Sequence, residues 1–202
     1  MRKYKFTALL LCAAMAVTAA AGCSDGKNSS RPISVTSGSE QQPQTEVNTN
    51  NEGRADNEVS AAVAEKASAN KTGFTLNRVI DAGTRNDKNE RFIYLDITID
   101  NSTDKEYELS MLNNFYLLLG NGSELHYHVG SQLYATNNID GYIPSPFNVP
   151  ASGQFSGIVG GFAVGEDVKD FKVCFFPTPD DPNKTPDVIK VDITDSDIVT
   201  LK

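Results

Sequence analysis

The sequence contains no tryptophan, two histidines and three cysteines in 202 residues, and it is short of positive charge. Its 18 Lys and Arg residues stand against 26 Asp and Glu residues, which gives a net charge of −8. Such a surface repels nucleic-acid phosphates and anionic headgroups, and no Lys/Arg cluster with interleaved aromatic residues offsets the repulsion. We therefore expect no nucleic-acid partner and no electrostatic membrane patch.

The cysteines are too few for a disulfide framework and suggest no catalytic nucleophile. Cys12 lies in an N-terminal apolar segment, and Cys23 follows that segment directly. Cys174 stands in the strand-like run 171–176, where a free cysteine is most often a small buried hydrophobe. No pattern places a histidine beside Cys174 or beside a serine in a nucleophile turn. The sequence thus predicts a protein that is not an enzyme and needs no bound cofactor.

The N-terminus has the organisation of a signal peptide. Arg2, Lys3 and Lys5 precede an uncharged apolar run over 6–17, which is too short and wrongly flanked for a spanning helix. We therefore assign residues 1–22 to a signal peptide for export.

The end of that segment, Ala20-Ala21-Gly22-Cys23, resembles the lipobox of bacterial lipoproteins. In that family the cysteine thiol receives diacylglycerol, and a peptidase then cuts before it. The resemblance implies a lipid on Cys23, a membrane as partner through that lipid, and a location on the outer side of a bacterial membrane, at the cell surface or in the periplasm. Ordinary secretion with cleavage after Ala21 is the alternative, but it leaves a cysteine before a polar run unexplained.

Residues 23–72 have the composition of a disordered polar linker. From residue 24 to about 70 the chain is mostly Ser, Asn, Gln, Thr, Glu, Ala and Gly, with no aromatic residue to seed a core. The stretch 59–67 has helix-forming composition and could form a marginal helix.

Residues 73–202 read as one all-β domain, because β-branched and aromatic residues alternate with polar ones between turn signals. In the clearest strand Ile93, Leu95 and Ile97 point to one face, while Tyr94 and Asp96 point to a face that we expect to be wet. About seven strands predict an antiparallel, two-sheet sandwich. Their ranges are 74–82, 92–100, 114–119, 125–129, 155–164, 171–176 and 188–194.

Two segments carry a family resemblance. Residues 91–105 and 149–162 resemble the telokin-like, immunoglobulin-fold domain of unknown function that is found in bacterial lipoproteins. The similarity extends over residues 73 to about 194. It implies an immunoglobulin-like fold and an envelope location, and it brings no known catalytic set. Within the second segment Gly160 and Gly161 predict a bulge or a close approach inside a strand.

Glu124, His126 and His128 form the one metal-ligating pattern. A period of two places all three on one face of a strand, and two imidazoles with a carboxylate can bind zinc. The alternative is that they form the solvent face of a strand. The acidic runs 180–183 and 192–197 match no calcium loop, and solvated turns explain them better.

A long, partly apolar connection contains Tyr134, Tyr142, Ile143 and Phe147. Loops at the end of a sandwich commonly bind partners, so these residues are candidates for a partner-binding loop. The alternative is a crossover packed over the sandwich edge, which burial of Tyr142 and Phe147 would favour.

The sequence as a whole favours an exported, lipid-anchored envelope protein that displays a noncatalytic interaction module for an envelope or extracellular protein or glycan. Two alternatives stay open. One is a sensory or enzymatic metal-binding protein that uses Glu124, His126 and His128. The other is a structural envelope protein or an accessory subunit.

Overall fold

The computed structural model describes residues 57–178, 181 and 183–201. The predicted signal peptide, Cys23 and most of the predicted linker lie outside the described residues. Within them, no helix is long and apolar enough to cross a membrane. The elements, in chain order, are β1 (Glu58–Ala61), β2 (Lys66–Ala69), β3 (Thr72–Thr84), β4 (Glu90–Asn101), β5 (Tyr107–Leu109), α1 (Met111–Asn114), β6 (Phe115–Leu119), β7 (Glu124–Leu125), α2 (Val129–Asn138), β8 (Phe147–Val149), β9 (Gln154–Gly165), β10 (Phe171–Phe175), β11 (Val188–Ile193), the 3-10 turn η2 (Asp195–Asp197) and β12 (Ile198–Thr200).

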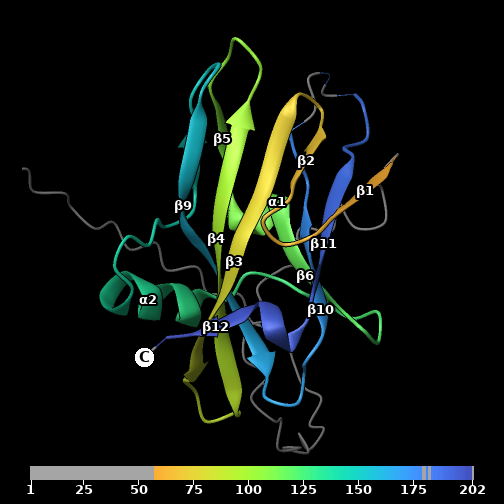
Figure 1. Cartoon of the computed structure of the whole chain (residues 1–202). Helices are drawn as coiled ribbons and strands as arrows, with labels where there is room; N and C mark the ends of the chain where they lie inside the picture. The colour runs from red at the N-terminus through yellow and green to blue at the C-terminus, as the bar shows by residue number, and fades with distance from the viewer. Residues whose placement is uncertain (1–56, 179–180, 182, 202) are drawn as a thin grey trace, which may run out of the picture. The chain divides into compact units, whose positions relative to one another are not determined.

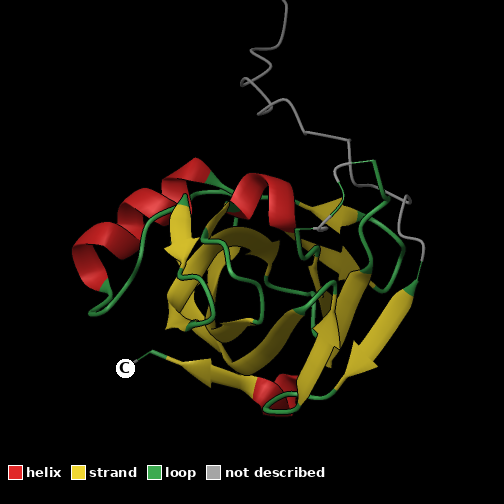
Figure 2. Ribbon diagram, turned by 90° about the horizontal axis from the view of Figure 1, so that it is seen from above, coloured by secondary structure: helices red, strands yellow, loops and turns green. Residues whose placement is uncertain are grey.

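Two five-stranded sheets face each other in a sandwich-like, mostly β fold, which confirms the predicted architecture at that level (Figures 1 and 2). The first sheet has the strand order β1-β11-β10-β6-β7. The second has the order β12-β3-β4-β9, with β2 added to the edge of β3. A small third sheet joins β5 and β8.

The core between the sheets follows from the alternation in the long strands. In β4, Ile93, Leu95, Ile97 and Ile99 are fully buried, as their period of two predicts. Aromatic rings connect the two sheets, because Phe74 of β3 stacks on Phe175 of β10 with ring centroids 4.7 Å apart.

The other face of β4 is partly exposed at Asp96 and Thr98, as predicted, but its first half is covered. Tyr94 and Phe92 are buried there, under a second cluster that includes Ala135 and Ile139 from α2 and its end. Figure 2 shows α2 lying outside the ring of strands. The alternation within β4 could not reveal this cover, because α2 comes about forty residues later in the chain.

The fold begins at Glu58 rather than at residue 73. Strand β1 pairs with β11, and β2 pairs with β3, so residues 58–69 belong to the domain and not to the linker. The stretch 59–67 forms strands and a turn instead of a marginal helix, with Ala64 at φ 64° in that turn. Val59, Ala61 and Ala67 pack against the core, and this tertiary packing overrides their helical propensity.

Three further details differ from the sequence prediction. The sandwich is not wholly antiparallel, since β1–β11 and β12–β3 are parallel pairs. The described residues form twelve strands, several of them only two to four residues long, instead of about seven. The strand expected over 125–129 ends at Leu125, because α2 begins at Val129.

Candidate functional site

The three predicted metal ligands occupy different surroundings. His126 Nε2 lies 3.5 Å from Glu124 Oε2, and the His126 ring stacks on Tyr116. His128 is the N-cap of α2, where its Nδ1 accepts a hydrogen bond from the Ser131 backbone N–H at 3.1 Å. A helix cap of this kind satisfies one of the free N–H groups of the first turn.

The predicted metal site is therefore wrong in its geometry. Among the residues that the structure describes, no group of three His, Cys, Asp or Glu side chains could hold a metal ion. The period of two applies only within a strand, and β7 ends at Leu125. The chain then turns toward α2, and the His128 ring packs on Phe92 of the other sheet, with centroids 5.6 Å apart.

The first half of the predicted partner-binding loop is mostly α2, packed on the outer face of β4. Tyr134 lies edge-on to Phe92 at 5.9 Å, and the Arg85 guanidinium lies 5.1 Å from the Tyr134 ring centroid. Tyr142 donates a hydrogen bond from its hydroxyl to the Gly160 carbonyl at 2.8 Å. Partial burial raises the pKa of Tyr142.

The second half of that segment is packed as well. The Ile143 N–H donates to the Ile158 carbonyl of β9 at 2.8 Å. Phe147 is buried and stacks on Phe155 with centroids 4.4 Å apart. These contacts favour the packed crossover over a ligand-reading loop, because Tyr142 and Phe147 already use their apolar surfaces inside the molecule.

Gly160 and Gly161 form the expected bulge, and the start of α2 rests on it. Their φ angles are +112° and +128°, and the β4–β9 register shifts between Ile93 and Tyr94. The His128 N–H donates to the Gly161 carbonyl at 2.7 Å. The backbone of α2 thus lies closer to the strand than a side chain at residue 161 would allow.

Cys174 is the buried, free cysteine that the sequence predicted. Burial raises the pKa of the Cys174 thiol to about 11. At neutral pH the thiol is therefore protonated and lacks the thiolate that a nucleophile needs.

The acidic run 192–197 comprises the end of β11 and the turn η2, and its residues Asp192 and Asp195 are exposed, so solvated charges explain the run in part as expected. Asp192 accepts a hydrogen bond from Lys172 Nζ at 2.6 Å, and Asp195 lies 4.0 Å from Lys169 Nζ. Asp197 accepts the Thr194 N–H at 2.9 Å and so begins η2.

Sequence reasoning missed an apolar groove of about 430 Å³ at one end of the first sheet. The turn between β6 and β7 forms one side, and the start of β10 with the end of β11 forms the other. Four apolar side chains line it, namely Leu118, Leu119, Phe171 and Ile193. Its volume lies within the range of about 300–1,000 Å³ that is usual for ligand sites.

Strand register explains how these residues meet. Phe171 pairs with Leu119 of β6 on one side and with Ile193 of β11 on the other. Leu118, Lys172 and Asp192 form the next row, which points to the outer face of the sheet. At the turn, Gly120 leaves open space, since a Cβ there would meet nothing within 4 Å. The groove is therefore the uncovered end of three adjacent strands.

Charged groups stand at the rim of the groove. The Asp192 hydrogen bond raises the pKa of Lys172, so that this lysine stays protonated at neutral pH. Asp170 is exposed, and no described residue forms an ion pair with it.

A second hollow, of about 590 Å³, lies at the opposite end of the sandwich and is lined by polar and charged residues; we call it the polar hollow. Lys71, residues 102–107 and Thr178 line it. Lys71 precedes β3 and residue 102 follows β4, so this hollow lies where β3 begins and β4 ends.

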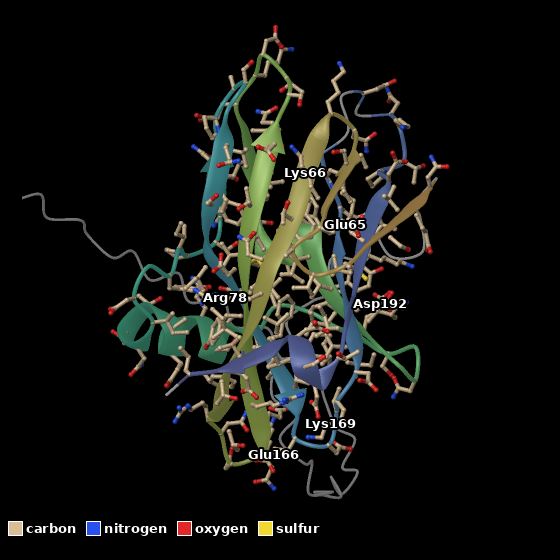
Figure 3. All side chains as sticks on the ribbon, viewed as in Figure 1. Glu65, Lys66, Arg78, Glu166, Lys169 and Asp192 are labelled. Atoms are coloured by element: carbon tan, nitrogen blue, oxygen red, sulfur yellow. The ribbon has the colours of Figure 1, made fainter. Side chains whose placement is uncertain are left out.

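The chain enters the domain at the end that carries the polar hollow. Val188 N–H, at the start of β11, donates to the Asn57 carbonyl at 3.0 Å. Lys184, from the loop before β11, donates to Asn70 at 3.2 Å, beside the β2–β3 turn. Ile193 in the apolar groove ends β11, about 16 Å farther along that strand at roughly 3.3 Å per residue. Figure 3 shows the same separation, with Lys66 toward one end and Lys169 at the other.

Residues 61–154 match the family described as Domain of unknown function (DUF4352). The match runs from the last residue of β1 to the first residue of β9. It includes the β6–β7 side of the groove and leaves out β10 and β11 on the other side. No curated protein matches the sequence.

Several solved structures share part of the fold at low identity. The ycdA protein from Bacillus subtilis subsp. subtilis str. 168, provisionally described as a lipoprotein, is 10% identical with a TM-score of 0.49. The alignment covers 68% of this chain and 40% of the ycdA chain, so this chain spans less than half the length of that protein. The yjhA protein from Bacillus subtilis is 12% identical with a TM-score of 0.47, covering 64% of this chain and 98% of that chain. An uncharacterised β-sandwich protein from Clostridium difficile 630 is 9% identical with a TM-score of 0.38, covering 68% of this chain and 95% of that chain.

Proposed function

We propose that the chain is an exported, lipid-anchored protein of the bacterial envelope that displays a noncatalytic, immunoglobulin-like interaction module. Its lipid is a diacylglycerol on Cys23, and its partner is an envelope or extracellular protein or glycan. The observation that carries the proposal is the placement of the apolar groove at the end of the domain opposite Asn57, where the chain enters the fold.

This placement suits a protein that is held from its N-terminal side. Residues 24–56 separate Cys23 from the described domain, and the domain is entered beside the start of β11. The polar hollow then lies on the side of the attachment, while the groove lies away from it. A partner on the outer side of the membrane can therefore reach the groove without crossing the membrane.

The chemistry of the groove supports recognition more than catalysis. Its apolar floor supplies binding free energy, and its few charged groups can orient a partner. Lys172 is held protonated by Asp192, so it does not supply a base at neutral pH.

The anchor is tested by the intact mass of protein extracted from membranes of the producing cells. We expect a mature chain that begins at Cys23 and carries diacylglycerol. Cys23→Ser should move the protein to the soluble fraction, whereas the matched control Cys12→Ser should leave both mass and location unchanged. A mature chain that begins at Gly22 without acyl mass would refute the anchor.

A further inference from the structure

We infer that the groove between the β6–β7 turn and the ends of β10 and β11 receives an apolar side chain from an extended, basic peptide segment of another protein. The inference deepens the proposed function, on which it rests for the access of such a partner to the groove. The proposed peptide carries Lys or Arg beside an aromatic or aliphatic residue.

The floor of the groove is apolar. Phe171 and Ile193 are only 3% and 2% exposed, so they form a rigid base that belongs to the core. Leu118 and Leu119 are half-buried beside them and present apolar surface that one further side chain could cover. Covering such surface favours binding because it removes apolar area from water.

The two segments that flank the groove are acidic. Residues 166–172 and 192–197 contain six carboxylates against two lysines. Both lysines already face a carboxylate, since Lys172 contacts Asp192 and Lys169 lies near Asp195. The rim therefore keeps an excess of negative charge, which attracts Lys and Arg and repels phosphate polymers and anionic lipid. Figure 3 shows Glu166 and Lys169 at this end of the domain.

The β6–β7 turn leaves room for the backbone of a partner. Gly120 and Gly122 line the groove without side chains, and a Cβ on either would meet nothing within 4 Å. A peptide backbone can therefore lie close to this turn while its side chain enters the groove. A folded partner protein could reach the same place only with a narrow projection from its surface.

The test uses the mature chain, residues 23–202, with Cys23→Ser to keep it soluble, and follows backbone amide resonances by NMR. Three capped peptides are added separately: Gly-Ser-Lys-Phe-Lys-Ser-Gly, its Lys-Ser-Lys counterpart and its Glu-Phe-Glu counterpart. We expect the first peptide to shift resonances of Gly120, Phe171 and Ile193. Its Kd should be at least about ten-fold lower than that of either counterpart, because each counterpart lacks one of the two features.

Two variants separate the two features. Leu118→Gln should raise the Kd of the Lys-Phe-Lys peptide about ten-fold by making the floor polar. Asp170→Asn should raise it about three-fold at low salt, and by less at 0.3 M salt, since the effect is a screened rim charge. Asp104→Asn is the matched control, because Asp104 is exposed at the polar end, and this variant should leave the Kd unchanged.

Four results would overturn the inference. The Glu-Phe-Glu peptide could bind as tightly as the Lys-Phe-Lys peptide, or the resonance shifts could map to residues 102–107 instead of the groove. There could be no shifts up to millimolar peptide, or the groove resonances could shift with protein concentration alone. The last would mean that a second copy occupies the groove. If Leu118→Gln does not fold, the exposed Asp170→Asn variant still decides the charge feature. The mass experiment on Cys23 is independent, so the peptide idea can fail while the anchored protein of the proposed function stands.

Discussion

The contact between Gly161 and the first turn of α2 leads to a quantitative prediction. In Gly161→Ala the new Cβ would lie 2.9 Å from Ser131 Oγ and 3.3 Å from the Gln132 nitrogen, both on α2. The φ of +128° is also one that alanine rarely adopts, at a cost of about 1–3 kcal/mol. Moving α2 away would weaken the hydrogen bond from His128 N–H to the Gly161 carbonyl, which is worth about 1 kcal/mol. We expect the free energy of unfolding to fall by about 2–4 kcal/mol.

The assay is urea unfolding followed by far-UV circular dichroism and by tyrosine fluorescence, since the chain has no tryptophan. The midpoint should fall while the slope with urea stays unchanged, which marks a loss of stability without a change in the unfolded state. Gly120→Ala is the matched control: position 120 has open space and no positive φ, so its stability should stay within about 0.5 kcal/mol of the parent chain.

A Gly161→Ala chain as stable as the Gly120→Ala chain would refute this reasoning. It would mean that α2 can shift by several tenths of an ångström without loss, and that the bulge does not determine where the helix lies. A large loss of stability at both positions would mean that the contact with α2 is not the cause. The lower entropy of the unfolded chain would not explain either loss, because by itself it stabilises the folded protein.

Further predictions concern three buried sites. Tyr94→Phe removes the hydroxyl that donates to the Ser131 carbonyl at 2.7 Å, and calorimetry should show about 1–2 kcal/mol less stability. Arg91→Met leaves Asp81 without its ion-pair partner, which lies 3.1 Å away in a site where both side chains are 11% exposed. Urea unfolding should therefore show a loss of about 3–5 kcal/mol in the free energy of unfolding. Adding Asp81→Leu to this variant should recover part of that loss. Cys174, with its pKa raised to about 11, should react with a disulfide reagent at pH 8 at less than about 1% of its rate in the unfolded, Cys23→Ser chain. Above about pH 9 the unfolded chain loses a Cys174 proton that the folded chain keeps, so stability should fall as the pH rises toward 11.

The long strands could be predicted from the sequence, because each carries its own evidence. In β4 the alternation of Ile93, Leu95 and Ile97 with polar residues identifies both the strand and its core face. The β6–β7 turn is equally clear from Gly120 and Gly122, and the observed pairing of Leu118 with Glu124 follows from it.

The short strands could not be predicted, because their evidence lies elsewhere in the chain. Residues 58–61 form β1 only because β11, more than a hundred residues later, offers a free edge beside them. A polar sequence with scattered alanines gives no local sign of this pairing. For the same reason the sequence predicts a linker that extends too far and a wet face for Tyr94, which α2 covers.

The candidate site shows the same limit more sharply. Glu124, His126 and His128 are close in sequence, yet after the end of β7 the chain carries His128 to the cap of α2, away from the Glu124–His126 pair. Leu119, Phe171 and Ile193 are far apart in sequence, yet register places them in one row. A period of two identifies a face within one strand, whereas a groove across strands needs the register of three.

The extent of the family match bears on where function could reside. The matched residues 61–154 contain β3, β4 and the β6–β7 turn, and they end before β10 and β11. Phe171 and Ile193 therefore lie outside the matched segment, as do the charged groups of 166–172 and 192–197. Properties common to the matched family must rest on the matched strands, while the acidic apolar groove requires strands beyond them. Phe171 and Ile193 belong to the core shared with β3 and β4, so changing them should also cost stability. Changing the exposed Asp170, which lies beside β10 and outside the matched segment, should instead alter binding and leave the matched part of the fold intact.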